Sequence, residues 1–316
     1  MRVYSIPMRT PFRGLTRREG VLIHGPAGWG EFSPFAEYGA KESARWLATA
    51  REAAYDGWPA PLRDRVPVNA TVPAVDPERA YAITKVSGCR TAKVKVAERG
   101  QSDADDLARV EAVRDAVGPA GKVRVDANGA WDVDHAQRMI KMLDRFDLEY
   151  AEQPCATLEE LAAVRRRVDV PIAADESIRR AEDPLRVRAA EAADIAVLKV
   201  QPLGGVRHAL RVAEACGLPV VVSSAIETSI GLAAGLALAA ALPALPYACG
   251  LATLPLLEGD VVADPLLAEA GELAVRRPDV DQAALARYEI DGPGWRRKVA
   301  DAQSLMDAPP VIGVIR

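Results

Sequence analysis

Short apolar runs and amphipathic stretches alternate along most of the chain. From Val66 onward, eight runs rich in Val, Ile, Leu and Ala are each too short to form a core helix. These runs are VPVNATV, TAKVKV, KVRVDA, LEYAEQ, PIAADE, IAVLKV, PVVVSS and YACGLA. Continuous apolar runs of this kind are typical of parallel strands that are covered on both faces. The pattern therefore predicts eight parallel strands.

Helical patterns separate these strands, with apolar residues at three- and four-residue spacing. In SDADDLARVEAVRDAVG, Ser102 can cap the helix, acidic residues occupy the first turn and Gly118 follows the end. Further helices are expected in WDVDHAQRMIKMLDRF, TLEELAAVRRRV, DPLRVRAAEA, GVRHALRVAEACG and SIGLAAGLALAAAL. Eight strands that alternate with helices predict an α/β protein built on a modified TIM barrel, a closed (β/α)8 ring.

The two ends of the chain follow other patterns. Near the N-terminus, MRVYSIPMRT, GVLIHG and GWGEFSP are typical of short strands, and KESARWLATAREAAYDG is an amphipathic helix. Residues 261–316 contain scattered Pro and Gly and show no further strand–helix period. We expect an α+β capping domain at residues 1–64, a barrel domain at 65–260 and a C-terminal segment at 261–316 that packs back on the capping domain.

Composition and charge exclude several classes of protein. The 316 residues carry 40 basic and 44 acidic side chains, so a net charge of -4 gives no general attraction to nucleic acid or anionic lipid. The alanine-rich stretch 232–245 is too short to span a bilayer and is broken by Pro243. Four widely spaced cysteines are typical of reduced, buried residues. We expect a cytoplasmic protein that has neither nucleic acid nor membrane as a partner.

Five charged residues recur where successive predicted strands end. They are Lys95, Asp126, Glu152, Asp175 and Lys199. Neighbouring members are 23 to 31 residues apart, about the length of one strand, one helix and two loops. In a barrel, the C-terminal ends of the strands converge on the face that carries the active site. The spacing therefore places three carboxylates and flanking lysines together on that face.

The three carboxylates, Asp126, Glu152 and Asp175, are candidate metal ligands. Any one of them alone is also typical of a helix cap or a loop, but three in a small space repel one another unless a cation lies between them. Oxygen ligands without His or Cys favour a hard ion, and Mg²⁺ leaves positions open for substrate oxygens. Glu176 is a candidate for a supporting or a structural role, and Asn128 for holding a ligand or reaching the substrate.

Lysines and serines at other strand ends complete the candidate site. Lys93 and Lys95 share one face of their strand, where closely placed ammonium groups and partial burial favour a neutral base at about pH 7. Two solvated lysines on an edge strand are the alternative, although a closed barrel has no edge. Lys199 lies across the barrel, where a structural ion pair is the alternative. Ser223 and Ser224 are helix caps or bind a substrate carboxylate.

A base beside a metal-bound carboxylate is the proton-abstraction chemistry of the enolase superfamily, which the sequence resembles. Lys93 and Lys95, the three carboxylates on strands three to five and Lys199 resemble its muconate-lactonising subgroup. Within that subgroup, FRGLTRREG and SSAIETSIGLAAG are similar to the o-succinylbenzoate synthases of menaquinone biosynthesis. The resemblance implies a Mg²⁺-dependent lyase that dehydrates a small carboxylate, 2-succinyl-6-hydroxy-2,4-cyclohexadiene-1-carboxylate, to 2-succinylbenzoate.

The resemblance also implies roles for individual residues. Lys95 would take the proton next to the carboxylate, and Lys199 would stabilise the resulting enediolate as a cation from the other face. Lys93 would help to lower the pKa of Lys95. Because the capping unit of this family closes over the barrel, residues from Arg13 to Glu19 are candidates to contact the succinyl tail.

Three alternatives remain open at this point. A racemase of N-acylamino acids or an epimerase of dipeptides would use the same lysines and metal. A Schiff-base aldolase would use Lys199 as its nucleophile, although three carboxylates argue against it. A binding protein without activity would leave the five converging charges unexplained. Trapping of a Schiff base with borohydride would identify the aldolase. Missing metal dependence would favour the binding protein.

Overall fold

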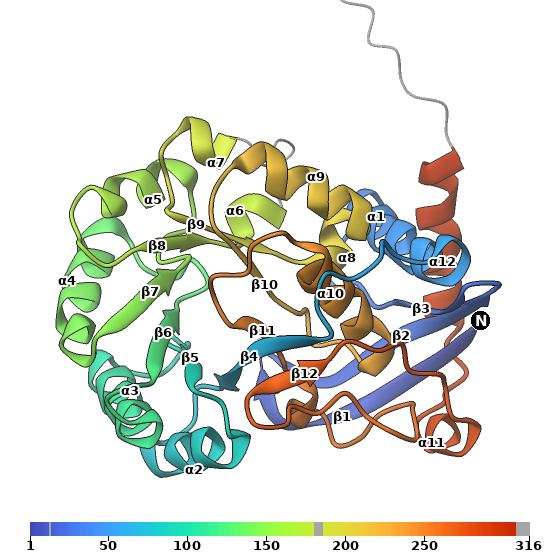
Figure 1. Cartoon of the computed structure of the whole chain (residues 1–316), viewed down its shortest axis with the longest axis horizontal. Coiled ribbons are helices and arrows are strands. Elements are labelled where there is room, and N and C mark those ends of the chain that lie inside the picture. The colour runs from blue at the N-terminus through green and yellow to red at the C-terminus, as the bar shows by residue number, and fades with distance from the viewer. Residues whose placement is uncertain (13, 180–185, 308–316) are drawn as a thin grey trace, which may run out of the picture.

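The computed structural model describes residues 1–12, 14–179 and 186–307. Within these residues, a ring of strands is surrounded by helices, and a smaller sheet lies to one side of the ring (Figure 1).

All eight expected strands are present and form the ring. They are β4 (Arg65–Val72), β5 (Thr91–Lys95), β6 (Lys122–Asp126), β7 (Leu148–Glu152), β8 (Ile172–Ala174), β9 (Ile195–Leu198), β10 (Val220–Val222) and β11 (Cys249–Ala252). Neighbours in the sequence pair in parallel from β4 to β10, and β11 pairs with β4. A parallel bridge between Ser223 and Gly250 joins the two remaining edges. The predicted closed barrel is therefore confirmed.

Helices follow the strands around the outside of the barrel. They are α2 (Pro77–Ser87), α3 (Asp103–Val117), α4 (Val133–Leu143), α5 (Leu158–Arg165), α6 (Glu176–Arg179), α7 (Arg186–Ala189), α8 (Val200–Leu203), α9 (Val206–Cys216) and α10 (Ser229–Ala241), with short turns η2 (Asp144–Phe146) and η3 (Leu254–Leu256). The alternation of strands and helices predicts a helix at α2 without giving its residues, and in the structure Asp76 caps it and Pro77 occupies its first position. Residues 183–185 of the expected helix DPLRVRAAEA lie outside the described residues.

The ends of α3 follow the signals in its sequence. The hydroxyl of Ser102 accepts a hydrogen bond from the backbone N–H of Asp105, and the Asp105 carboxylate accepts one from the N–H of Ser102. This reciprocal cap satisfies two N–H groups that the helix leaves without partners. Gly118 follows the last turn with φ +73°, a conformation that glycine adopts at little cost. Both predictions for this helix are confirmed.

The smaller sheet is antiparallel and belongs to the N-terminal region. Its strands are β1 (Arg2–Phe12), β2 (Leu15–Gly25) and β3 (Gly28–Phe32), followed by α1 (Ala40–Arg51) and the π-helical turn η1 (Glu52–Asp56). Strand β2 is longer than expected, because it begins before the run GVLIHG. Phe32, Trp46 and Ala302 belong to the core cluster between this sheet and its helices.

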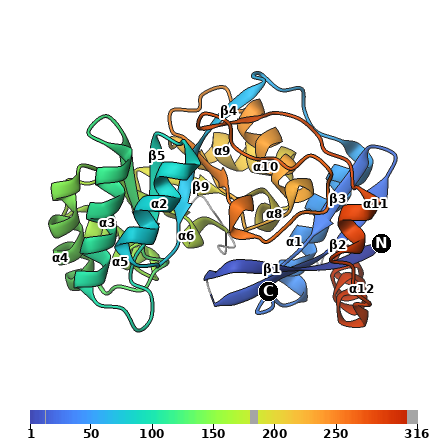
Figure 2. The ribbon, with the colours of Figure 1, turned by 90° about the horizontal axis from the view of Figure 1, so that it is seen from below.

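The C-terminal region contacts both parts of the molecule. Helix α12 (Pro293–Asp307) packs on α1, and the two lie beside β1, β2 and β3 in Figure 2. Strand β12 (Glu272–Ala274) pairs antiparallel with β4 of the barrel, and α11 (Gln282–Ala286) follows it. The contact with the barrel was not expected from the sequence. Residues 308–316 lie outside the described residues.

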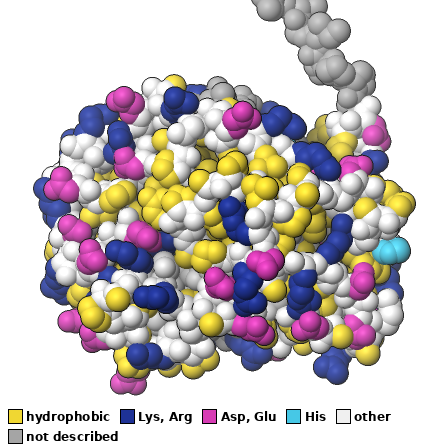
Figure 3. Space-filling view, in the orientation of Figure 1, with side chains coloured by type: hydrophobic (Ala, Val, Ile, Leu, Met, Phe, Trp, Pro, Cys, Tyr) yellow, Lys and Arg dark blue, Asp and Glu magenta, His cyan; other side chains and the backbone are white. Residues whose placement is uncertain are grey.

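The surface matches the balanced composition. On the face in Figure 3, Lys and Arg side chains alternate with Asp and Glu around the rim. Alternating charges create no broad field of one sign. No helix of the described ranges has both the length and the apolar content needed to cross a membrane.

Candidate active site

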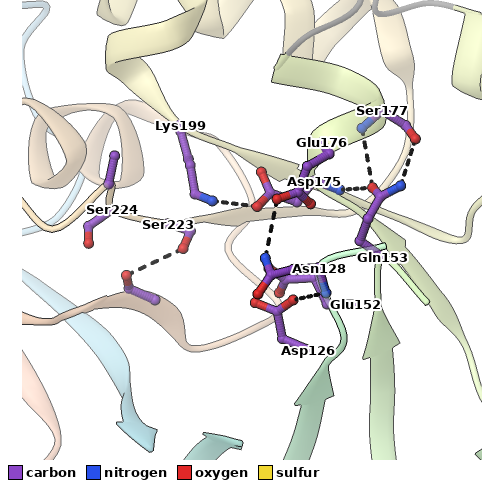
Figure 4. Close-up of polar contacts among 12 residues, drawn as sticks. Asp126, Asn128, Glu152, Gln153, Asp175, Glu176, Ser177, Lys199, Ser223 and Ser224 are labelled. Atoms are coloured by element: carbon purple, nitrogen blue, oxygen red, sulfur yellow. Dashed lines mark hydrogen bonds and ion pairs between the residues drawn. The ribbon is translucent and has the colours of Figure 1, made fainter. Parts of the chain in front are cut away.

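The five predicted charges lie together at the C-terminal ends of the barrel strands. Lys95, Asp126 and Glu152 are the last residues of β5, β6 and β7. Asp175 and Lys199 directly follow β8 and β9. All five are buried, and none is more than 8% exposed. Figure 4 shows the carboxylates of three successive strands facing Lys199.

Lys95 is held on the side of β6. Its Nζ lies 2.5 Å from Asp126 Oδ2 and 2.5 Å from Asn128 Oδ1, and 5.2 Å from the ring centre of Phe12. Asn128 has φ +48° and donates through Nδ2 to Glu176 Oε1 at 3.2 Å. Asn128 therefore links the ammonium group of Lys95 to the loop after β8.

Lys93 lies one layer deeper in the barrel and pairs with two carboxylates. Its Nζ is 2.7 Å from Glu152 Oε1 and 3.3 Å from Asp126 Oδ2. Burial lowers the pKa of Lys93, but the charges of Glu152 and Asp126 outweigh burial and raise it above the ordinary value. Lys93 is therefore charged in this arrangement. The sequence led us to expect a neutral base at one of Lys93 and Lys95 and to assign that role to Lys95, and a charged Lys93 is compatible with this prediction.

Lys199 approaches the carboxylates from the opposite side. Its Nζ donates to Asp175 Oδ2 in a buried ion pair. Strands β5 and β9 are four positions apart in a ring of eight, so they face each other across the barrel. Lys95 and Lys199 therefore flank the carboxylates from two sides, as the spacing in the sequence predicted.

The carboxylates fit a divalent cation in their chemistry, although lysines hold them here. Among the described residues, no three His, Cys, Asp or Glu side chains are grouped closely enough to hold a metal as they stand. Burial raises the pKa of Glu152 to about 7. Repulsion by the charges of Asp126 and Asp175 raises this pKa further, whereas the charge of Lys93 lowers it. Among the residues that the structure describes, no group donates a hydrogen bond to the buried Glu152 Oε2. An oxygen in this state fits the ligand set of a hard cation.

Gln153, next to Glu152, connects two of the loops that carry these groups. Its Oε1 accepts from the backbone N–H groups of Asp175 at 3.0 Å and Ser177 at 3.2 Å. Its Nε2 donates to Ser177 Oγ at 2.8 Å (Figure 4). It also donates to the carbonyl of Cys155 at 2.9 Å. Gln153 is fully buried and has φ +40°, which is uncommon for a residue other than glycine.

A small cavity adjoins the charged groups and reaches the capping sheet. Its free space is about 30 Å³. It is lined by Lys93, Lys95, Asp126, Asn128 and Lys199, by Ser223, Ser224, Ala225 and Ile226 after β10, by Thr71, Gly250 and Thr253, and by Phe12 and Phe35 of the N-terminal region. Phe12 and Phe35 close the cavity opposite the barrel.

The two predicted serines lie in the wall of this cavity. Ser223 Oγ is 3.5 Å from the carbonyl of Gly250, at the limit of a hydrogen bond. Ser224 Oγ shares a hydrogen bond of 2.7 Å with Thr253 Oγ1. Neither hydroxyl caps α10, because Thr228 is the N-cap of that helix. Of the two uses expected for these serines, the capping role is therefore excluded.

The expectation that residues from Arg13 to Glu19 contact the succinyl tail stays a prediction. Arg13 itself lies outside the described residues, and Leu15 to Glu19 belong to strand β2. None of Gly14 to Glu19 lines the cavity. Glu19 accepts hydrogen bonds from Ser5 and Trp295 instead. The expectation treated the segment as a loop, whereas it continues a hairpin.

Sequence analysis missed several residues of the site. Thr71 is the last residue but one of the first barrel strand, and the rule that identified Lys95 missed it because Thr71 carries no charge. Gln153 is an amide beside a predicted ligand, which is a weaker signal. Phe12 and Phe35 carry no local signal, because only the packing of the capping sheet on the barrel brings them to the cavity.

Comparisons with known proteins agree with this geometry. Residues 77–283 match the family described as Enolase C-terminal domain-like, and residues 3–54 match Enolase N-terminal domain-like. The chain is 72% identical over 303 residues to an o-succinylbenzoate synthase of Thermobifida fusca (strain YX), covering 96% of both chains. It is 59% identical over 311 residues to one of Mycolicibacterium smegmatis, covering 97% of this chain and 96% of that protein.

Solved structures support the same fold. A muconate lactonizing enzyme from Pseudomonas fluorescens, solved with muconolactone, superposes with a TM-score of 0.80 at 23% identity. The superposition covers 92% of this chain and 97% of that enzyme. Its architecture is that of the barrel and capping sheet seen here. By sequence and by fold, the chain belongs to the enolase superfamily and, within it, to the family of the o-succinylbenzoate synthases.

Proposed function

We propose that this chain is an o-succinylbenzoate synthase, a lyase that removes water from 2-succinyl-6-hydroxy-2,4-cyclohexadiene-1-carboxylate. The observation that carries the proposal is 72% identity with a synthase over 96% of both chains. Two lysines on opposite sides of three buried carboxylates support it, because the reaction needs a base on one face of a bound carboxylate.

Asp126, Glu152 and Asp175 are proposed to hold the divalent cation used throughout this superfamily, and we propose Mg²⁺. Bound there, the ion would supply positive charge next to the carboxylate of the substrate. Glu176, which Asn128 contacts, is proposed to support this group.

Lys95 is proposed to remove the proton from the carbon that bears the carboxylate. The electron pair of the broken C–H bond becomes part of the aromatic ring as the C–O bond to the hydroxyl breaks, and the departing hydroxide takes up the proton that Lys95 has removed and leaves as water. Lys199 remains an ammonium group on the opposite face, where its charge stabilises the negative charge that develops on the substrate. Lys93 holds the carboxylates of Glu152 and Asp126 in place.

The role assigned to Lys199 also distinguishes a synthase from a Schiff-base aldolase. A Schiff base requires a neutral amine. Lys199 forms a buried ion pair with Asp175, which favours its charged form. A cation is what the synthase needs at this position.

Turnover of the cyclohexadiene by the purified chain tests the proposal. We expect 2-succinylbenzoate to form with added Mg²⁺, to stop with EDTA and to resume when Mg²⁺ is restored. Deuterium exchange of N-succinylamino acids in D₂O is followed in parallel. Rapid exchange of both enantiomers without dehydration would replace the synthase by a racemase of the same superfamily. Turnover that persists after complete metal removal would contradict the proposed metal site.

A further inference from the structure

One wall of the cavity is a loop, residues 223–228, whose backbone is strained. Ser223 to Ile226 line the cavity between β10 and α10. Ile226 has φ +64°, in the left-handed region. A β-branched residue is an outlier there and adopts this conformation at a cost in energy, so surrounding contacts must hold it.

Arg18 of strand β2 supplies such a contact from the capping sheet. It is 2% exposed. Its Nε donates to the carbonyl of Ile226 at 2.9 Å, while Nη2 donates to Ser33, with Ser33 Oγ at 3.0 Å. The same guanidinium lies 4.9 Å from the ring centre of Phe35, which lines the cavity from the capping side. One buried side chain therefore supports two opposite walls of the cavity.

A second residue of the capping sheet fixes the end of the loop. Glu31 of β3 accepts hydrogen bonds from the backbone N–H groups of Thr228 at 3.2 Å and Gly231 at 3.0 Å. A Cβ at Gly231 would lie 2.6 Å from Glu227 Cβ and 3.0 Å from Glu31 Cδ. Glycine at position 231 thus allows a capping-sheet carboxylate to reach the first turn of α10.

The positive charge of Arg18 compensates two buried carboxylates near the loop, Glu227 and Glu31. Both carboxylate oxygens of Glu227 lie 2.9 Å from the backbone N of Ala225. Burial raises the pKa of Glu227 to about 7, the charge of Glu31 adds to the increase and that of Arg18 opposes it. Loss of the guanidinium charge would leave two buried carboxylates without this compensation.

We propose that Arg18 is a positioning residue that sets the affinity for substrate by holding Ile226 and Phe35 in the cavity wall. The inference rests on the proposed function for the identity of the substrate. Arg18 donates to Ile226, Ser33 and Glu19, and none of these is a site lysine or a proposed metal ligand. Its loss should therefore weaken substrate binding more than it slows proton transfer.

Two variants test this inference in the whole chain. Arg18→Met removes the charge and every hydrogen bond, whereas Arg18→Lys keeps the charge and loses the forked contact with Ile226 and Ser33. Arg17→Lys is the matched control, because the exposed Arg17 lies on the same strand and donates to Ser5 instead of the cavity wall. The measurements are KM and kcat for the cyclohexadiene and hydrogen–deuterium exchange of peptides that cover residues 219–230.

We expect the KM of Arg18→Met to rise about tenfold or more, since a charged hydrogen bond to a buried group is lost. Its kcat should stay within about threefold, and the loop peptides should exchange faster. Arg18→Lys should show a smaller change in the same direction, and Arg17→Lys should match the wild type. If Arg18→Met does not fold, Arg18→Lys alone decides the question.

The result that overturns the inference is distinct from failure of the proposed function. Unchanged loop exchange in the Arg18 variants, or a fall in kcat with unchanged KM, would show that Arg18 does not position the wall. Absence of dehydration by the wild type would instead refute the synthase assignment. Loop exchange would then still report whether Arg18 holds Ile226.

Discussion

The side chain of Gln153 holds the backbone of Asp175. Gln153 Oε1 accepts from the N–H of Asp175 at 3.0 Å, and the same amide binds Ser177 from both of its ends. Gln153 directly follows one proposed ligand, Glu152. Its side chain therefore fixes the position of another proposed ligand, Asp175, at the end of the next strand. Partners of this kind orient ligands and tune metal affinity.

We predict that Gln153→Ala lowers the affinity for Mg²⁺ by about 10- to 100-fold, the usual effect of losing a residue that orients a ligand. Titration calorimetry with Mg²⁺ or Mn²⁺ measures this directly, without reference to turnover. Gln303→Ala serves as the control, because Gln303 lies on α12 and contacts Arg51 and Asp307 at the surface. Wild-type affinity in Gln153→Ala would show that Asp175 is positioned by other contacts.

The metal site leads to a second prediction. Asp126→Asn, Glu152→Gln and Asp175→Asn each remove a charge with little change of shape, so we expect folded proteins that have lost both divalent-ion binding and activity. Asp134→Asn is the control, since Asp134 forms an exposed ion pair with Arg167. Circular dichroism establishes the fold and calorimetry the binding. A variant with full binding and activity would remove that residue from the ligand set.

A third prediction concerns the two site lysines. Lys95→Arg should lose about 10²- to 10⁴-fold in kcat, the contribution of a general base, because a guanidinium does not deprotonate at neutral pH. Lys199→Arg should lose less, because it keeps the positive charge that we assign to this position. The exposed Lys122, at the opposite end of β6, provides the control variant Lys122→Arg. Equal losses at both positions would favour two neutral bases, as a racemase requires.

A fourth prediction concerns pH and Glu227. Burial raises the pKa of Glu227 in the folded chain to about 7, with a further increase from Glu31, against an ordinary value of 4.5. Between these values the unfolded chain loses its proton while the folded chain keeps it. The contribution of Glu227 to stability is therefore lost as pH rises from about 4.5 to 7, by at most about 3 kcal/mol.

Glu227→Gln cannot ionise, so its free energy of unfolding relative to the wild type should increase between pH 5 and pH 8. Urea denaturation at several pH values measures the difference. The variant Glu258→Gln, at an exposed position, controls for general changes in charge. A constant difference between Glu227→Gln and the wild type across this range would contradict the prediction.

The sequence by itself determined the barrel and the position of its charged groups. Eight apolar runs were enough to predict eight parallel strands, because a strand buried on both faces must be apolar along its length. Five of these runs end in a charged side chain. These five side chains were predicted to lie on one face of the barrel, since the C-terminal ends of barrel strands meet there. Lys95, Asp126, Glu152, Asp175 and Lys199 were identified in this way.

Only the tertiary structure decided which groups meet across these elements. The pairing of Lys93 with Glu152 and Asp126 depends on distances between three strands, and these distances set the direction of its pKa shift. Arg18 and Ile226 are 208 positions apart in the sequence, and nothing local to either predicts their hydrogen bond. Local sequence specifies elements and their faces, whereas contacts between the capping sheet and the barrel arise only when both are packed together.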